Sequence, residues 1–152
     1  MIEHCIYRTL KMKNLIIVLL VFFSLNTIAQ EKYFNSESDI KVFSEKVTLL
    51  FKENKPVEAF KELAAYWPLP ETELELIKEK TVKGLNLVQN TYGKPIGTKR
   101  VNYKVIENTA IRDAHFVKYE ISALRFIYIY YKTDKGWILN QFKFDENFDE
   151  EF

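Results

Sequence analysis

Cysteine and histidine are almost absent from this sequence of 152 residues. There is one cysteine, Cys5, and of the two histidines only His115 lies beyond the first thirty residues. A lone thiol cannot form a disulfide within the chain, and zinc sites are typically built from several cysteines and histidines. We therefore predict neither an intramolecular disulfide nor a metal site.

Glycine and excess charge are also scarce. The four glycines are too dispersed along the chain to form a phosphate-binding loop, so we expect no nucleotide cofactor. The net charge is +1 and no basic stripe runs along the sequence, which argues against nucleic-acid binding. With only four prolines besides, the composition is not that of a disordered chain. The sequence thus predicts a folded domain without a cofactor.

The longest apolar run lies near the N-terminus, at residues 15–23. Lysines precede it, and the small residues Thr27 and Ala29 follow it. Positive charge, a short apolar core and small residues at a cleavage site form the pattern of a secretory signal peptide. The run is about half of the roughly 20 residues that a membrane-spanning helix needs, so a retained membrane anchor is the less favoured alternative.

Cleavage is predicted after Ala29, so that residues 1–29 are the signal peptide and residues 30–152 form one exported domain, periplasmic or secreted. Translation that starts at Met12 would give a more compact signal peptide. Cys5 is removed with the signal, and no cysteine stands at the cleavage site to carry a lipid. We therefore expect a soluble domain without a stable membrane anchor.

Helical periodicity dominates the first half of this domain. It predicts a helix that is capped at Ser36 or Ser38 and ends before residues 53–55. A second helix is predicted to begin at Pro56, and a third to run from about residue 71 to a stop at Gly93. Two prolines in residues 66–70 separate the second helix from the third.

After Gly97 the period changes to two. Four stretches alternate, or are rich in β-branched and aromatic residues, and are predicted strands: residues 101–105, 115–122, 124–131 and 137–144. Residues 108–113 are interpreted as a connection. The uncharged stretch 126–131 is expected to be a central strand, because such a strand would aggregate at an edge. Helices followed by strands predict an α+β fold, with helices packed on an antiparallel sheet of four or more strands.

Acidic residues crowd the end of the sequence. Residues 145–152 contain five carboxylates. Runs of like charge are usually solvated, so a solvated acidic tail is the preferred interpretation. The alternative is a site for a cation or a partner.

Three stretches resemble the nuclear transport factor two-like (cystatin-like) superfamily. Residues 43–60 resemble the opening helix, break and second helix of its exported members, residues 92–97 the crossing to the first strand, and residues 136–144 the last strand. The resemblance spans about residues 36–146. It implies a bent sheet that forms a cone-like cavity with the helices, and frequent dimers through the sheet face. The family's enzymes use a carboxylate base and a hydrogen-bonding acid inside the cone, but no carboxylate here is predicted to face inward.

Aromatic residues of the sheet are the remaining functional signal. Tyrosine and tryptophan combine an apolar body with a polar tip, which suits a ligand pocket or an interface, although an ordinary sheet core is the alternative. The candidate pocket or interface residues are Tyr103, His115, Tyr119, Tyr128, Tyr130 and Trp137. No catalytic residue is assigned, because no nucleophilic triad can be built around the single histidine of the domain. Three carboxylates are interpreted as solvated strand residues: Glu107, Asp113 and Glu120.

Together these features predict a non-enzymatic exported domain that binds a small apolar ligand or a protein partner through its sheet, and that could form a homodimer through the same face. The alternative is a small isomerase- or hydrolase-like enzyme that uses a pocket carboxylate or His115 beside a tyrosine hydroxyl.

Overall fold

The computed structural model describes residues 32–152, and the predicted signal peptide lies outside the described residues. Helices come first: α2 (Glu37–Lys52), α3 (Pro56–Ala64) and α4 (Glu71–Tyr92). Four strands and a 3-10 helix follow: β1 (Pro95–Ile106), β2 (Ala110–Tyr119), β3 (Ala123–Thr133), β4 (Gly136–Asp145) and η1 (Asp149–Glu151). The predicted α+β fold class is confirmed, with the helices N-terminal to a four-stranded antiparallel sheet.

Local sequence signals set the limits of the helices. At the start of α2, Ser36 Oγ accepts a hydrogen bond from the Asp39 N–H at 3.2 Å, and Asp39 Oδ2 accepts one from the Ser36 N–H at 3.0 Å. This capping box satisfies backbone donors that a helix start leaves free. Pro56 occupies the first turn of α3. α4 ends at Gly93, whose φ of 81° is a conformation that glycine adopts without strain.

The strands form a meander in the order β1-β2-β3-β4, each antiparallel to the next. β3 lies between β2 and β4, as predicted for the uncharged stretch. The predicted connection at residues 108–113 is wrong, because residues 110–113 already belong to β2. Asn108 takes a positive φ of 47°, and the chain therefore turns between β1 and β2 within three residues.

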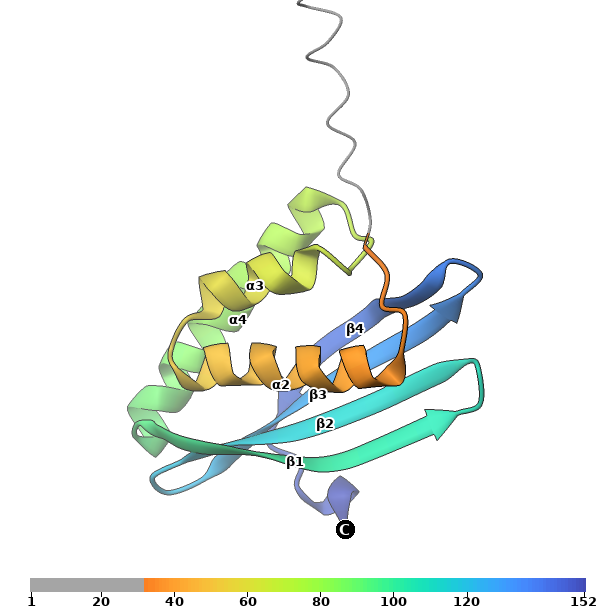
Figure 1. Ribbon diagram of the computed structural model, residues 1–152. Helices are drawn as coiled ribbons and strands as arrows, with labels where there is room; N and C mark the ends of the chain where they lie inside the picture. Colours follow the sequence, from red (N-terminus) through yellow and green to blue (C-terminus); the bar gives the residue numbers. More distant parts are fainter. Residues whose placement is uncertain (1–31) are drawn as a thin grey trace, which may run out of the picture. The chain divides into compact units, whose positions relative to one another are not determined.

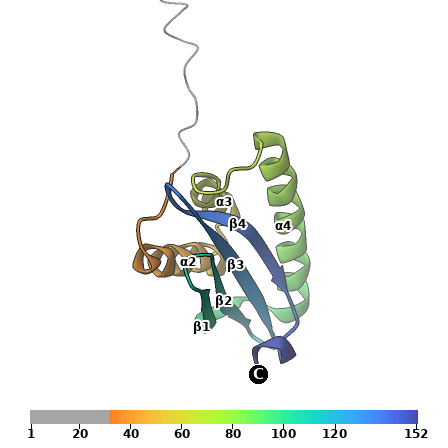
Figure 2. The same cartoon turned by 90° about the vertical axis from the view of Figure 1, so that its right-hand side faces the viewer.

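The helices lie on one face of the sheet, which we call the inner face (Figure 1). α2 crosses that face, and α4 runs beside β4 (Figure 2). Alternate residues of β3 enter the core between the helices and the sheet: Leu124, Phe126, Tyr128 and Tyr130. Because side chains alternate along a strand, the residues between them point to the opposite, outer face.

Two tyrosine hydroxyls of β3 join the inner face to α2. Tyr130 Oη and Ser44 Oγ are 2.7 Å apart, and Tyr128 Oη and Thr48 Oγ1 are 2.9 Å apart. All four residues are fully buried. A buried hydroxyl without a partner costs about 1–3 kcal/mol, so these two pairs favour one position of α2 on the sheet.

Residues 145–152 are not the solvated tail that the sequence favoured. The side chain of Glu151 is only 2% exposed, and it accepts hydrogen bonds from Asn102, Arg112 and Arg125. The Phe148 ring meets the Phe116 ring edge-on, with centroids 5.1 Å apart. The acidic segment therefore packs on the outer face, because arginines there supply opposite charge and a phenylalanine supplies apolar contact.

Candidate functional site

A group of polar side chains lies on the inner face. Asp113 and His115 are two residues apart on β2 and so share this face. Tyr103 is opposite Asp113 on β1, and Tyr128 is opposite it on β3. Arg100 is opposite His115 on β1. We call these five residues the inner polar cluster.

The carboxylate of Asp113 stands at the centre of this cluster. It is fully buried, its Oδ1 accepts a hydrogen bond of 3.0 Å from Arg100 Nε, and His115 Nε2 lies 3.0 Å from the same oxygen. Arg100 Nη2 also donates to the backbone carbonyl of Lys41 on α2, at 2.6 Å. A buried carboxylate needs a partner of opposite charge, and Arg100 supplies it while bridging the sheet to the helix.

Three buried side-chain atoms have no hydrogen-bond partner within residues 32–152, and all belong to the inner polar cluster. They are Tyr103 Oη, Asp113 Oδ2 and His115 Nε2. Although Nε2 is close to Oδ1 of Asp113, the two atoms are not aligned as a hydrogen bond. Each such atom costs about 1–3 kcal/mol, and native proteins keep few of them without a functional reason. Their presence on paired strands makes the cluster the candidate functional site.

Burial keeps the tyrosine hydroxyls of this region protonated. Burial, followed by the nearby carboxylates of Glu37 and Asp113, raises the pKa of Tyr103 to about 12. Burial also raises the pKa of Tyr128 and Tyr130 far above the usual value, although their hydrogen bonds to α2 act in the opposite direction. At neutral pH the Tyr103 hydroxyl is therefore a hydrogen-bond donor and not a base.

The inner polar cluster comes nearest to solvent at the edge strand β1. The Arg100 side chain is 28% exposed, and Tyr103 is half-buried. Lys41 Nζ lies 4.3 Å from the centroid of the Tyr103 ring, where cation and ring attract each other. The Glu37 carboxylate, in the first turn of α2, lies near the Tyr103 hydroxyl and raises its pKa, although the two groups do not have the geometry of a formed hydrogen bond. A molecule that approaches from this edge would therefore meet charges of both signs before it reached Asp113.

The structure brings together four of the six residues that the sequence singled out. Tyr103, His115 and Tyr128 belong to the inner polar cluster, and the His115 and Tyr128 rings meet edge-on with centroids 5.9 Å apart. Tyr130 is the next inward residue on β3, and its hydroxyl is engaged by Ser44. All except Tyr103 are buried.

Tyr119 and Trp137 lie apart from this group. Tyr119 ends β2, four residues from His115, a separation of roughly 13 Å along a strand. Trp137 is near the start of β4, where its backbone pairs with Phe34 and Lys132 Nζ lies 5.3 Å from its ring centroid. Both side chains are buried in the core, so they do not line the inner polar cluster.

Asp113 and Arg100 are the site residues that the sequence did not reveal. The interpretation of Asp113 as a solvated carboxylate is wrong, and so is the expectation that no carboxylate faces inward. The available signal was the alternation along β2, in which Asp113 and His115 continue the face of Ile111 and Val117. This alternation was missed because residues 108–113 were assigned to a connection, and a loop residue is not assigned to either face of a sheet.

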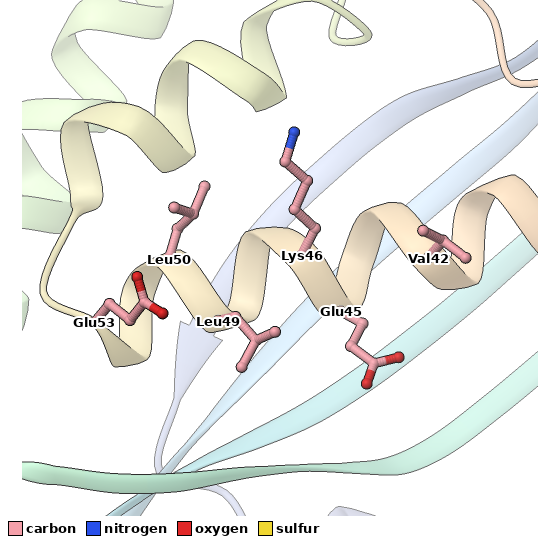
Figure 3. Close-up of a pocket in the computed structure, with 6 residues that line it drawn as sticks. All are labelled: Val42, Glu45, Lys46, Leu49, Leu50 and Glu53. Atoms are coloured by element: carbon pink, nitrogen blue, oxygen red, sulfur yellow. The ribbon is translucent and has the colours of Figure 1, made fainter.

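A hollow of about 420 Å³ lies away from the inner polar cluster, on the exposed side of α2. Its lining residues come from that helix and from Glu53, which follows its last residue (Figure 3): Val42, Glu45, Lys46, Leu49, Leu50 and Glu53. Lys46 points toward α3, where it pairs with Glu62 at 2.8 Å. None of the unpartnered buried polar atoms lines this hollow, so it has fewer groups that could hydrogen-bond a ligand than the inner polar cluster has.

Within residues 32–152, no group of three histidine, cysteine or acidic side chains is placed to hold a metal ion. In the same part of the chain, no helix is long and apolar enough to cross a membrane.

Comparisons of the whole chain with protein-family models, curated proteins and solved structures give no match.

Proposed function

We propose that the domain binds a small polar molecule at the inner polar cluster. The observation that carries the proposal is the set of three unpartnered buried atoms. Asp113 Oδ2 can accept a hydrogen bond, Tyr103 Oη can donate one, and His115 Nε2 can do either according to its protonation. A compound with a hydroxyl or amino donor next to a carbonyl or hydroxyl acceptor would satisfy these atoms together. The ligand class is therefore small hydroxy- or amino-carbonyl compounds.

Contacts of the inner tyrosines favour a polar ligand over the apolar ligand first expected. The hydroxyls of Tyr128 and Tyr130 are bonded to Thr48 and Ser44 of α2. Their rings are fully buried in the core. An apolar ligand would have to displace α2 from these rings, whereas a polar ligand would use atoms that α2 leaves unbonded.

A second function, acid–base catalysis, is favoured by the distance of 3.0 Å between His115 Nε2 and Asp113 Oδ1. A carboxylate beside an imidazole can orient it as a general base, and the Tyr103 hydroxyl could donate a hydrogen bond to a developing oxyanion. The resemblance to the nuclear transport factor two-like superfamily implies this combination of an inward carboxylate and a hydrogen-bonding acid. An isomerase- or hydrolase-like activity is therefore the alternative, and turnover of a bound compound distinguishes it from simple binding.

The proposal is tested by ligand-observed NMR, with a panel of small hydroxy- and amino-carbonyl compounds and the purified protein. Tyr103→Phe removes one unpartnered atom, and Asp113→Asn replaces the carboxylate and also removes the charge that pairs with Arg100. Tyr131→Phe is the control because its hydroxyl lies on the outer face. Loss of one hydrogen bond to a buried charged or polar group should weaken binding about tenfold. We expect this loss in both cluster variants and not in the control.

Signals of the imidazole locate the bound compound. The chain has only His4 and His115, so the ring resonances of His115 are readily assigned. They should shift when a panel compound binds. Equal binding to the wild type and to both cluster variants, or binding without any change at His115, would contradict the proposal.

A further inference from the structure

Within residues 32–152, the chain covers only part of the outer face of the sheet. Residues 146–152 contribute Phe148, which meets Phe116, and Glu151, which accepts hydrogen bonds from Arg112. Beyond this contact, four apolar residues lie in register across all four strands and point outward: Ile106, Ala110, Tyr131 and Ile138. We call them the outer apolar row.

Large side chains of this row are open to solvent. Ile106 is 65% exposed and Tyr131 is 49% exposed. Neighbouring strands are roughly 4.8 Å apart, so the row spans roughly 14 Å from β1 to β4. That is about the length of three helical turns, or of four residues of extended chain. Contiguous exposed apolar surface of this kind is typical of an interaction site.

Basic residues stand beside the outer apolar row. Lys104 precedes Ile106 by one outward position on β1 and is exposed. Lys143 is also exposed and points outward on β4, farther along the sheet, where it is opposite Ile127. Among the outward positions of the four described strands, Asp145 is the only carboxylate, and it is engaged by Arg125. The exposed charges of the strands next to the row are therefore positive, and the nearest exposed carboxylate is Glu107, in the turn after Ile106.

We infer that the outer apolar row is a docking surface for an acidic segment of a partner protein that carries aromatic or other large apolar side chains. The C-terminal segment of this chain already shows the chemistry on the adjoining area, because it places an aromatic ring on Phe116 and a carboxylate on Arg112. Arg112 is the next outward residue after Ala110, so the two areas are continuous. A partner segment would extend this coverage, with its apolar side chains on Tyr131 and its carboxylates at Lys104.

The probe for the test is a synthetic peptide with the sequence of residues 145–152, added to isotope-labelled protein and followed by chemical-shift mapping. A second peptide with Asn and Gln in place of Asp and Glu is the matched neutral control. We expect the acidic peptide to shift the signals of Ile106, Tyr131 and Ile138. The neutral peptide should bind more weakly, because it lacks the charges that complement the lysines.

Variants of the protein separate the row from general charge attraction. Lys104→Glu combined with Lys143→Glu should weaken peptide binding about tenfold, since two rim contacts become repulsive. Lys80→Glu combined with Lys94→Glu changes the net charge equally, at exposed positions outside the sheet's outer face, and should leave binding unchanged. Tyr131→Ser should weaken binding without a change in charge.

Several outcomes would overturn the inference. Shifts centred on Arg125 would mean that the peptide only replaces the chain's own segment. Equal weakening by both lysine pairs would mean non-specific attraction. Phosphatidylglycerol vesicles that use the same residues when the peptide does not would identify a membrane surface instead. A dimer in light scattering that Tyr131→Ser dissociates would identify a second copy as the occupant.

Tyr103→Phe should not affect peptide binding, so this test is independent of the proposed ligand site.

Discussion

Arg125 donates two parallel hydrogen bonds, each of 2.9 Å, to the carboxylate of Asp145 on the neighbouring strand, although no part of Arg125 is exposed. Glu150 and Glu151 of η1 also accept hydrogen bonds from this guanidinium. The hydrogen bonds to Asp145 are the largest influence on the pKa of Arg125, and they raise it further above its already high value despite burial. The C-terminal segment is thus held to the sheet by a charged group inside the protein.

Substitution of Asp145 by alanine should destabilise the fold strongly. It would leave the buried guanidinium of Arg125 without its bidentate partner, while Glu150 and Glu151 still offset part of the charge. The cost should therefore approach, but stay below, the roughly 3–5 kcal/mol of an uncompensated buried charge. Urea denaturation of Asp145→Ala measures this loss in the free energy of unfolding. Glu150→Ala is the control, because the Glu150 side chain is 56% exposed and its pair with Arg125 should contribute less than about 1 kcal/mol. Similar losses in the two variants would contradict a dominant role for Asp145.

Acid should destabilise the same contact. Burial alone would raise the pKa of Asp145 and Glu151, but hydrogen bonds from Arg125 to Asp145, and from Arg112 and Asn102 to Glu151, outweigh it and hold both below their ordinary values. A carboxyl whose pKa is lower in the folded chain stabilises the fold above its unfolded pKa, and this is lost as the pH falls through the folded pKa. We expect stability to decline below about pH 4.

Urea midpoints over a series of pH values measure this dependence. Glu151→Gln should flatten the acid limb, because it removes one of the two responsible carboxyls. An acid limb with the same slope in the variant and in the wild type would show that other carboxyls control it.

The bond between Ser44 and Tyr130 offers a test of how α2 is held. Ser44→Ala leaves the buried Tyr130 hydroxyl without its partner and should cost about 1–3 kcal/mol. Adding Tyr130→Phe should recover part of that cost, since both polar groups are then gone. Ser38→Ala, at an exposed position of the same helix, should change stability by less than about 0.5 kcal/mol. Additive losses in a double-mutant cycle would refute the coupling.

Much of the fold could be predicted from the sequence, because its elements are periodic. Apolar spacing placed the three helices, and Pro56 and Gly93 mark a start and a stop that the structure confirms. The change to alternation predicted four strands and the place of β3 between β2 and β4, although β1 begins earlier than predicted, at Pro95, and β2 ends earlier than predicted, at Tyr119. The resemblance to the nuclear transport factor two-like superfamily, export and a dimer through the sheet stay predictions.

The site was harder to predict, because it depends on pairing across strands and not on a local motif. Asp113 was assigned to a loop, since a turn of three residues at Asn108 was not anticipated. The acidic segment was taken as solvated, since charge runs usually are. Its partners, Arg112 and Arg125, lie on the outer face of the two central strands, β2 and β3. A guanidinium buried there requires carboxylates from elsewhere in the chain.

Substitution of Tyr103 by phenylalanine should stabilise the protein. The hydroxyl has no hydrogen-bond partner within residues 32–152, so its removal relieves a desolvation cost of about 1 kcal/mol. Such a gain is typical where a residue is kept for binding and not for folding. Tyr128→Phe is the matched comparison and should destabilise, because it breaks the bond to Thr48. The midpoint of thermal unfolding measures both effects, and a loss in Tyr103→Phe would mean that its hydroxyl is bonded in the folded protein.

The central claim is that Asp113 and Tyr103 present unbonded polar atoms to a small polar ligand. The most direct measurement is an atomic-resolution crystal structure of the purified protein soaked with the best compound of the hydroxy- and amino-carbonyl panel. The account predicts ligand atoms about 3 Å from both Asp113 Oδ2 and Tyr103 Oη, with His115 Nε2 as a third contact. Side chains of the cluster that instead hydrogen-bond one another, with the compound located elsewhere, would contradict it.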